Sequence, residues 1–345
     1  MTSFPLRIFI IISPHTSCMS VSVADLQDYT NLVSYLTPSP PRVLEVDNLP
    51  SSLGSSLQYS ESDAALGIPK QILVQCFLRA RSIFFAPLND GYPDDGEVQQ
   101  DGELKEKQFS EERWNATTVM LLWDPNHSTA ANYRKHYILA QLSSSTGAND
   151  TGAMSVDRID LLLRELLFLE SLLTSPMRNH NKSPTLFNHR FWLLQNSILP
   201  NIGPDQKAES SQFIIARLWR EELGLVTKAG DKHVANYYAW NYARDVFDLL
   251  ANRSKNLQGG EDWICQNIKE SVEKVKAWCF KHPRDVSGWV FLTWLLEKCV
   301  ENGSDQGKET TTRTHEEVQG WRGRLLWEGA AVNAFVKHVE RLMNL

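Results

Sequence analysis

The stretch Asn236-Tyr-Tyr-Ala-Trp-Asn-Tyr-Ala-Arg244, which runs on into Asp-Val-Phe-Asp-Leu-Leu250, is one of four similar segments in this chain. Each segment has a bulky or small apolar residue, a polar or aromatic pair, an Arg or Leu, and then an apolar run. The other three lie at 129–139, 186–194 and 285–296, and successive copies follow after 56, 53 and 49 residues. A repeat of that size predicts a solenoid of helix pairs, because one pair alone cannot bury its apolar face.

Helix signals between the repeats extend this pattern over most of the chain. Ser183-Pro184 has the residue types of an N-cap followed by a first helical residue, and Asn236 is expected to cap the third repeat helix. Pro69 suits the start of an earlier helix, and Ser110 suits the start of the helix that precedes the first repeat. We therefore predict an all-α fold, a right-handed α-α superhelix (solenoid) of helix-pair repeats, with no sheet of more than a few residues.

The composition along the chain suggests its division into parts. We expect an N-terminal extension with a partly disordered start at 1–60, followed by one helical-repeat domain at 61–345. Two polar stretches, 90–107 and 303–314, are predicted to be flexible inserts. Within the domain, the repeat helices are expected near 126–145, 182–200, 234–252 and 283–300.

Composition also narrows the class of protein. The chain has 345 residues, 42% of them hydrophobic, and a formal net charge of −6 without a basic patch, which argues against nucleic acid as a partner. Its five cysteines form no Cys-x-x-Cys pair and read as reduced thiols of a cytoplasmic protein. The apolar run at 8–13 is too short to span a membrane, and no other stretch is long enough. That run reads either as a buried segment or as a poor signal peptide.

The four copies resemble the repeat of protein prenyltransferase α-subunits, and most closely the branch of prenyltransferase α-subunit repeat-containing proteins. The family pattern is an Asn or Ser near the helix start, an aromatic-rich turn, Trp, two residues, Arg and an apolar run. The best match is Asn236-Tyr-Tyr-Ala-Trp240, followed by Phe187-Asn-His-Arg190, while Asp285-Val-Ser-Gly-Trp289 resembles a later, divergent repeat. The resemblance covers roughly 110–300.

Several positions depart from the family pattern. Ala131 and Phe187 stand where Trp is usual, and Arg244 comes one residue late because Ala243 holds its place. The repeat residues are expected to pack successive units together, Trp as an apolar wedge and Arg as a planar donor to a neighbouring helix end. The residues assigned this structural role are Arg134, Phe187, Arg190, Trp240, Arg244 and Trp289.

The resemblance implies an α-subunit that wraps around a separate β-subunit, which holds the zinc and the isoprenoid pocket. Lys182 stands where the family places a lysine near the diphosphate leaving group, although Pro184 replaces the tyrosine that usually follows. Asn236, Tyr237 and Tyr238 match positions that face the active site. No Cys/His spacing in the chain suits zinc, so we expect neither a metal site nor another cofactor in this chain itself.

Two functions from different classes remain open. The first is an α-type subunit that supports transfer of a geranylgeranyl (or farnesyl) group to a protein cysteine and is inactive without its β-subunit. Its partners would be that β-subunit, a Rab- or SNARE-like acceptor protein and an isoprenoid diphosphate shared with the β-subunit. The second is a non-catalytic helical-repeat scaffold for protein interaction, which the departures at Ala131, Pro184 and Ala243 favour.

Overall fold

Helices make up most of the computed structural model, which describes residues 23–87, 99–143, 156–201, 208–255, 260–301, 305–325 and 329–344. A π-turn (Leu194–Ile198) extends α7, and two 3₁₀ turns cover Ser51–Leu53 and Leu199–Asn201. The helices within those ranges are α1 Val23–Leu36, α2 Lys70–Phe84, α3 Gln99–Trp123, α4 Ser128–Ser143, α5 Val156–Leu173, α6 Arg178–Asn181, α7 Pro184–Leu193, α8 Ala208–Lys232, α9 Tyr237–Lys255, α10 Gly260–Lys281, α11 Val286–Glu301, α12 Asp305–Leu325 and α13 Ala330–Met343.

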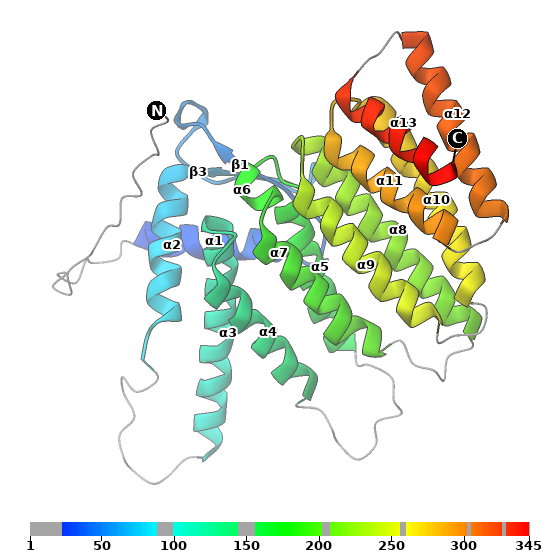
Figure 1. Ribbon diagram of the computed structural model, residues 1–345. Coiled ribbons are helices and arrows are strands. Elements are labelled where there is room, and N and C mark those ends of the chain that lie inside the picture. The colour runs from blue at the N-terminus through cyan, green and yellow to red at the C-terminus, as the bar shows by residue number, and fades with distance from the viewer. Residues whose placement is uncertain are drawn as a thin grey trace, which may run out of the picture.

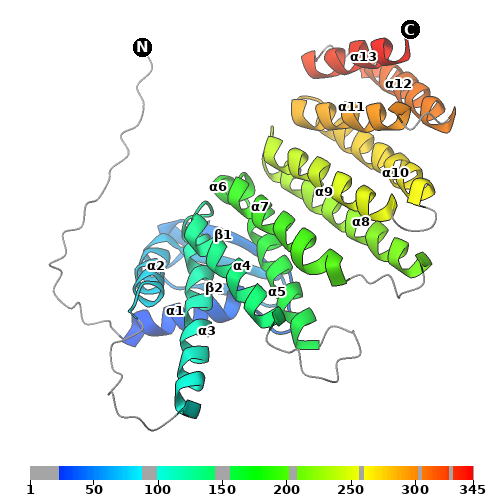
Figure 2. The same ribbon diagram turned by 60° about the horizontal axis from the view of Figure 1, so that its bottom comes forward.

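The long helices pack in pairs that follow one another along the molecule (Figures 1 and 2). The pairs are α3 with α4, α5 with α7, α8 with α9, α10 with α11, and α12 with α13. The four predicted repeat segments fall on α4, α7, α9 and α11, the second helix of the first four pairs. A mostly helical fold of paired helices is therefore confirmed.

A small sheet near the N-terminus corrects the strictly all-α prediction. Strands β1 (Glu45–Leu49), β2 (Gln58–Ser60) and β3 (Ala65–Pro69) lie in the order β1-β3-β2, with β1 parallel and β2 antiparallel to β3. Leu66 and Ile68 alternate with less buried residues along β3, and Val46 on β1 pairs with Leu66. This period of two is the strand signal, and it escaped notice because each strand has only three to five residues.

The sheet ties the N-terminal segment to the helical pairs. The backbone N–H of Leu44 donates to Ser171 Oγ on α5 at 2.9 Å, and Lys232 Nζ on α8 lies 2.6 Å from a Glu45 carboxylate oxygen. The domain boundary that we placed between residues 60 and 61 falls inside this sheet, between β2 and β3. The predicted disordered start, with the apolar run at 8–13, lies outside the described residues.

The segment predicted as a flexible insert at 303–314 is helical from residue 305 onward, so that prediction was wrong for 305–314. It forms the first half of α12, which packs on α10, α11 and α13. Thr310 and Thr311 each donate a side-chain hydroxyl to a carbonyl four residues earlier, at 2.8 and 2.9 Å, and both are buried. Because these hydroxyls are satisfied within the helix, a polar threonine run can line a helix interface.

The other predicted insert is also partly helical. Residues 99–107 belong to α3, which starts at Gln99 and therefore begins earlier than the Ser110 start that we predicted. The remainder of that insert, 90–98, lies outside the described residues. The α3 helix continues to Trp123, as expected.

Large aromatic side chains fill the spaces between successive pairs. Trp240 and Trp289 are buried, and the Trp240 ring lies 5.0 Å from the ring of Trp278 on α10 in an edge-to-face arrangement. Phe187, which stands where the family usually has Trp, is buried 5.2 Å from the ring of Tyr242. The packing role predicted for Phe187, Trp240 and Trp289 accords with this burial.

Gly288, in the first turn of α11, lets the chain approach Trp278 closely. A Cβ atom added at Gly288 would lie 2.3 Å from Trp278 Cζ3, a distance that the buried ring cannot tolerate. We expect Gly288→Ala to lower the free energy of unfolding by about 1–3 kcal/mol through overpacking. Urea unfolding followed by circular dichroism measures this.

Gly323 on α12 provides the matched control for that substitution. A Cβ atom there meets nothing within 4 Å. Gly323→Ala should therefore raise the free energy of unfolding by about 0.5–1 kcal/mol, because alanine restricts the unfolded chain and favours helix. Equal effects of the two substitutions would contradict the close approach of Gly288 to Trp278.

Candidate functional site

Four side chains in equivalent places cap the repeat helices α4, α7, α9 and α11. They are His127, Ser183, Asn236 and Asp285, which follow one another at the repeat spacing. Each accepts a hydrogen bond from the backbone N–H three residues later, at 3.2, 3.1, 3.3 and 3.4 Å respectively. The caps predicted at Ser183 and Asn236 are confirmed, and each cap satisfies an N–H group that the helix itself cannot bind.

The same residues also bind successive repeats to one another. Ser183 Oγ donates to the Pro125 carbonyl at 2.8 Å, and Asn236 Nδ2 donates to the Asn181 carbonyl at 2.9 Å. The backbone N–H of Ala235 donates to Asp285 Oδ2 at 2.9 Å. We call this line of helix starts the cap edge, formed by residues 124–127, 178–183, 233–236 and 282–285; it includes the ends of α7, α9 and α11 nearest the top of Figure 1.

Lys182 lies on the cap edge, directly after the short helix α6. Its Nζ donates to the carbonyls of Val234 at 2.7 Å and Ala235 at 3.3 Å, just ahead of α9. Partial burial and the nearby Arg178 guanidinium lower the pKa of Lys182. An ammonium group has three N–H donors, so two remain committed to this loop and one is left for a ligand.

The other predicted site residues divide into a buried one and an exposed pair. Asn236 is fully buried, both N–H groups of its amide donate to Asn181, and its carbonyl oxygen caps α9. Its side chain is therefore committed to the cap edge. Tyr237 and Tyr238 are 51% and 49% exposed on the first turn of α9. The structure thus brings Lys182 to the loop that leads directly into the two tyrosines.

Two repeat arginines lie in buried ion pairs with glutamates that the sequence analysis did not single out. Arg134 Nε donates to Glu165 Oε1 at 2.8 Å, and Arg190 Nε donates to Glu222 Oε2 at 2.8 Å. In each pair the arginine comes from the second helix of one pair and the glutamate from the first helix of the next. The signal that we missed is a glutamate 31 or 32 residues after the arginine.

A third residue joins each buried ion pair. His189 Nε2 lies 2.7 Å from Glu165 Oε1, and the hydroxyl of Tyr242 donates to Glu222 Oε2 at 2.6 Å. Burial alone would raise the pKa of Glu165, but Arg134 and His189 outweigh it and bring the pKa to about 2. These clusters are closed to solvent and join successive repeats. Arg134 and Arg190 bind buried glutamates there, whereas we expected each to donate to the end of a neighbouring helix.

Acid should destabilise the fold through His189. Burial lowers the pKa of His189, so as pH falls this imidazole is protonated in the unfolded chain before it is protonated in the folded chain. The stability that this provides is present above the unfolded pKa of ~6.5 and is lost as pH falls below it. We expect thermal unfolding midpoints of the wild-type chain to fall between about pH 6.5 and 5, and His189→Gln to flatten that slope.

The exposed His338 on α13 gives the control, since His338→Gln lies outside the cluster. His180 is a second buried histidine, and burial lowers its pKa in the same direction. If the unfolding midpoint of His189→Gln still falls with pH, the double variant His180→Gln/His189→Gln shows whether His180 is the cause. A wild-type slope that survives in that double variant would contradict the prediction.

In the ranges that the structure describes, no group of three or more His, Cys, Asp or Glu side chains could hold a metal ion. No helix among the described residues is long and apolar enough to cross a membrane. The four cysteines described there, Cys76, Cys265, Cys279 and Cys299, form no disulfide with one another.

Comparison with known proteins agrees with the repeat pattern. The chain is 27% identical over 198 residues to the human protein prenyltransferase alpha subunit repeat-containing protein 1, which covers 54% of this chain and 40% of the human protein. This chain is a distant homologue of the prenyltransferase α-subunit repeat-containing proteins. Residues 209–318, from α8 into α12, also match the family model described as the ECM9 middle domain.

Two further proteins similar to this chain extend the comparison. Yeast Protein ECM9 (Saccharomyces cerevisiae) is 24% identical over 146 residues, 42% of this chain and 32% of that protein. The geranylgeranyl transferase type-2 subunit alpha of Rattus norvegicus is 25% identical over 217 residues, 57% of this chain and 35% of that subunit. The chain spans 40% or less of the length of the first relatives that it matches.

Proposed function

We propose that this chain is the α-type subunit of a heterodimeric protein prenyltransferase and supports transfer of a geranylgeranyl (or farnesyl) group from its diphosphate to a protein cysteine. The observation that carries the proposal is the cap edge, where Lys182 reaches the loop that leads into Tyr237 and Tyr238. The similarity to type-2 geranylgeranyl transferase α-subunits over about half of the chain supports it.

In this role the cap edge would face the leaving diphosphate. The Lys182 ammonium would offset the negative charge that develops as the bond to the isoprenoid breaks. Arg178, four residues earlier and exposed on α6, would add a second cation. The hydroxyls of the exposed Tyr237 and Tyr238 would donate hydrogen bonds to substrate. Asn236 would hold the cap edge in place through its hydrogen bonds.

In this role the partner would supply the zinc. Zinc is expected in the β-subunit, where it would hold the acceptor cysteine as a thiolate. The paired helices would continue as a right-handed superhelix whose concave face covers the β-subunit. A cytoplasmic location and a Rab- or SNARE-like acceptor fit this role.

A non-catalytic scaffold is the second candidate, and three observations favour it. Lys182 Nζ already binds two backbone carbonyls, and Pro184 replaces the tyrosine expected beside it. A lysine used in this way stabilises the entrance to α9 and needs no substrate. The first relatives matched also carry names that describe their repeats.

Co-expression with the rat type-2 β-subunit tests the proposal. We expect the two chains to purify together, and the complex to transfer a labelled geranylgeranyl group to a Rab protein. The chain alone should transfer none and should bind no stoichiometric zinc by elemental analysis. A stable complex without transfer would favour the scaffold, and failure to form a complex would reject the subunit role.

A further inference from the structure

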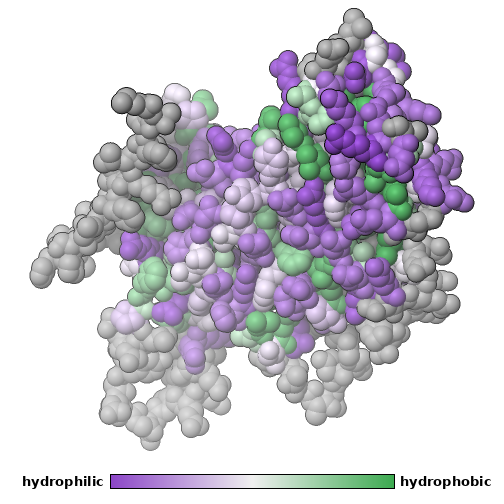
Figure 3. Space-filling model, viewed as in Figure 1, coloured by the Kyte–Doolittle hydropathy of each residue, from purple (hydrophilic) through white to green (hydrophobic). Residues whose placement is uncertain are grey.

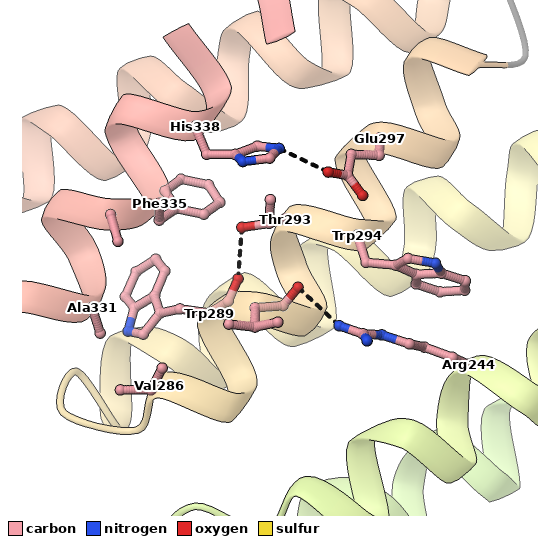
Figure 4. Close-up of a pocket in the computed structure, with 11 residues that line it drawn as sticks. Arg244, Val286, Trp289, Thr293, Trp294, Glu297, Ala331, Phe335 and His338 are labelled. Carbon is pink, nitrogen blue, oxygen red and sulfur yellow. Dashed lines mark hydrogen bonds and ion pairs between the residues drawn. The ribbon is translucent and has the colours of Figure 1, made fainter. Parts of the chain in front are cut away.

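A groove lies over α11 and is lined by residues of α9, α11 and α13. Figure 1 shows where these three helices lie in the molecule. The groove has a volume of about 310 Å³ and is distinct from the cap-edge residues discussed above. Figure 4 shows apolar side chains on its floor, Arg244 at one end, and Glu297 with His338 at the other. Its remaining lining residues are Val286, Trp289, Val290, Thr293, Trp294, Ala331, Ala334 and Phe335.

Within the part of the chain that the structure describes, Arg244 has no glutamate partner like those of Arg134 and Arg190. Arg134 and Arg190 each bind a buried glutamate through two guanidinium nitrogens. In the third repeat, the buried position is taken by Ala243 and the arginine comes one residue later. One residue turns a helix by about 100°, and Arg244 consequently lines the groove.

The guanidinium of Arg244 is poorly satisfied where it lies. Its buried Nε has no hydrogen-bond partner among the described residues, its Nη2 donates to the Val290 carbonyl at a long 3.4 Å, and its Cζ lies 5.8 Å from the centre of the Trp294 ring. Among the described residues it forms no ion pair within 4 Å, and its charge acts on the neighbouring Asp245 without a hydrogen bond between them. A guanidinium binds a planar carboxylate best, through two parallel N–H groups. Arg244 is therefore suited to bind a carboxylate from another molecule.

The floor of the groove is apolar and open to solvent. Val286 and Val290 are 43% and 45% exposed, although they stand beside the buried Trp289 and Phe335. Figure 3 shows hydrophobic residues that remain at the surface over this part of the molecule. At the far end His338 Nε2 lies 2.7 Å from Glu297 Oε1, so that carboxylate already has a partner.

We propose that this groove binds an amphipathic helix of a partner protein whose apolar side chains cover Val286 and Val290 and whose carboxylate pairs with Arg244. The walls are helices with satisfied backbones, which offer no strand edge to an extended peptide, whereas a helix satisfies its own backbone. A fatty acid fits less well, because its chain would stay half in water above the exposed valines. This inference does not depend on prenyl transfer.

A synthetic peptide tests the site on the full chain. The probe is an alanine-based helical peptide with leucines at i, i+3 and i+7 and one glutamate at i+4, paired with a version that has glutamine instead. Fluorescence anisotropy of the labelled peptides measures binding. We expect the glutamate peptide to bind about 10-fold more tightly than the glutamine peptide, the effect of one charge-assisted hydrogen-bond pair.

Variants assign the binding to the groove. Arg244→Gln should make the two peptides equal, and Val290→Asp should weaken both by at least about 10-fold. Arg217→Gln on α8, an exposed arginine outside the groove, is the matched control and should change nothing. Thermal melting confirms that each variant is folded, and hydrogen exchange should slow within 286–297 when the peptide binds.

Three results would overturn the proposal. The first is no binding of the glutamate peptide up to about 1 mM, which corresponds to a binding free energy of only about −4 kcal/mol. The second is equal binding of both peptides to the wild-type chain. The third is an unchanged preference for the glutamate peptide in Arg244→Gln. Binding of decanoate in place of the peptide, lost in Arg244→Gln, would assign the groove to an aliphatic acid and reject the helix.

Discussion

Replacing Glu222 with alanine should lower the free energy of unfolding by about 3–5 kcal/mol, the cost of leaving one charge of a buried ion pair uncompensated. Arg190 would lose two short hydrogen bonds, at 2.8 and 2.7 Å, and Tyr242 would lose its acceptor. Both ends of the pair are almost completely buried, so water cannot replace the lost carboxylate. Urea unfolding followed by circular dichroism measures the change.

The matched control for Glu222→Ala removes both charges together. In Arg190→Met/Glu222→Leu no charge is stranded, so the loss should stay within about 2 kcal/mol, as for other buried pairs replaced by apolar residues. The exposed pair Arg217 and Glu221 offers a second control, since Glu221→Ala should cost less than about 1 kcal/mol. A loss below about 1 kcal/mol in Glu222→Ala would contradict the buried pair.

Replacing Lys182 with alanine in the assembled heterodimer should reduce turnover by ~10- to 1000-fold, if the cap edge faces the diphosphate. That range is the usual cost of removing one donor to developing charge. Binding of the β-subunit should be unchanged, and the chain should lose about 1 kcal/mol or less from the two hydrogen bonds to Val234 and Ala235. Single-turnover transfer of a labelled isoprenoid separates the chemical step from assembly.

Lys298→Ala is the matched control for Lys182→Ala. Lys298 lies in the last turn of α11 and pairs with Glu301, so it has no place at the cap edge. Its variant should transfer the isoprenoid at the wild-type rate. Wild-type turnover in Lys182→Ala as well would show that this lysine only supports the start of α9, which would favour the scaffold.

Much of the fold could be predicted from local signals in the sequence. The recurring segments located α4, α7, α9 and α11, and the caps at Ser183 and Asn236 were predicted because an N-cap depends on residues only three apart. The errors also have local causes. Three strands of three to five residues are too short for a strong alternation, and the threonines of α12 look like a loop unless their bonds to the preceding turn are counted.

The candidate site was less predictable than the fold. Lys182, Asn236, Tyr237 and Tyr238 were selected by resemblance, and the sequence could not tell that Asn236 would be buried with every hydrogen-bonding group used. Glu165 and Glu222 went unnoticed because their arginines lie about thirty residues away, on a helix of another pair. Contacts between pairs depend on how the helices stack, which no local pattern contains.

The sequence by itself determined the repeated helix starts, the apolar faces and the family, since these follow from spacings within one or two turns. The tertiary structure alone decided which polar groups are hidden and which are open. The shift of one residue from Ala243 to Arg244 is visible in the sequence, but only the packing of α9 on α11 places that arginine at the lining of an apolar groove. Burial depends on the neighbours that folding brings together. An arginine therefore has a structural role in one repeat, and in the next repeat it lines a groove with N–H groups that can bind a ligand.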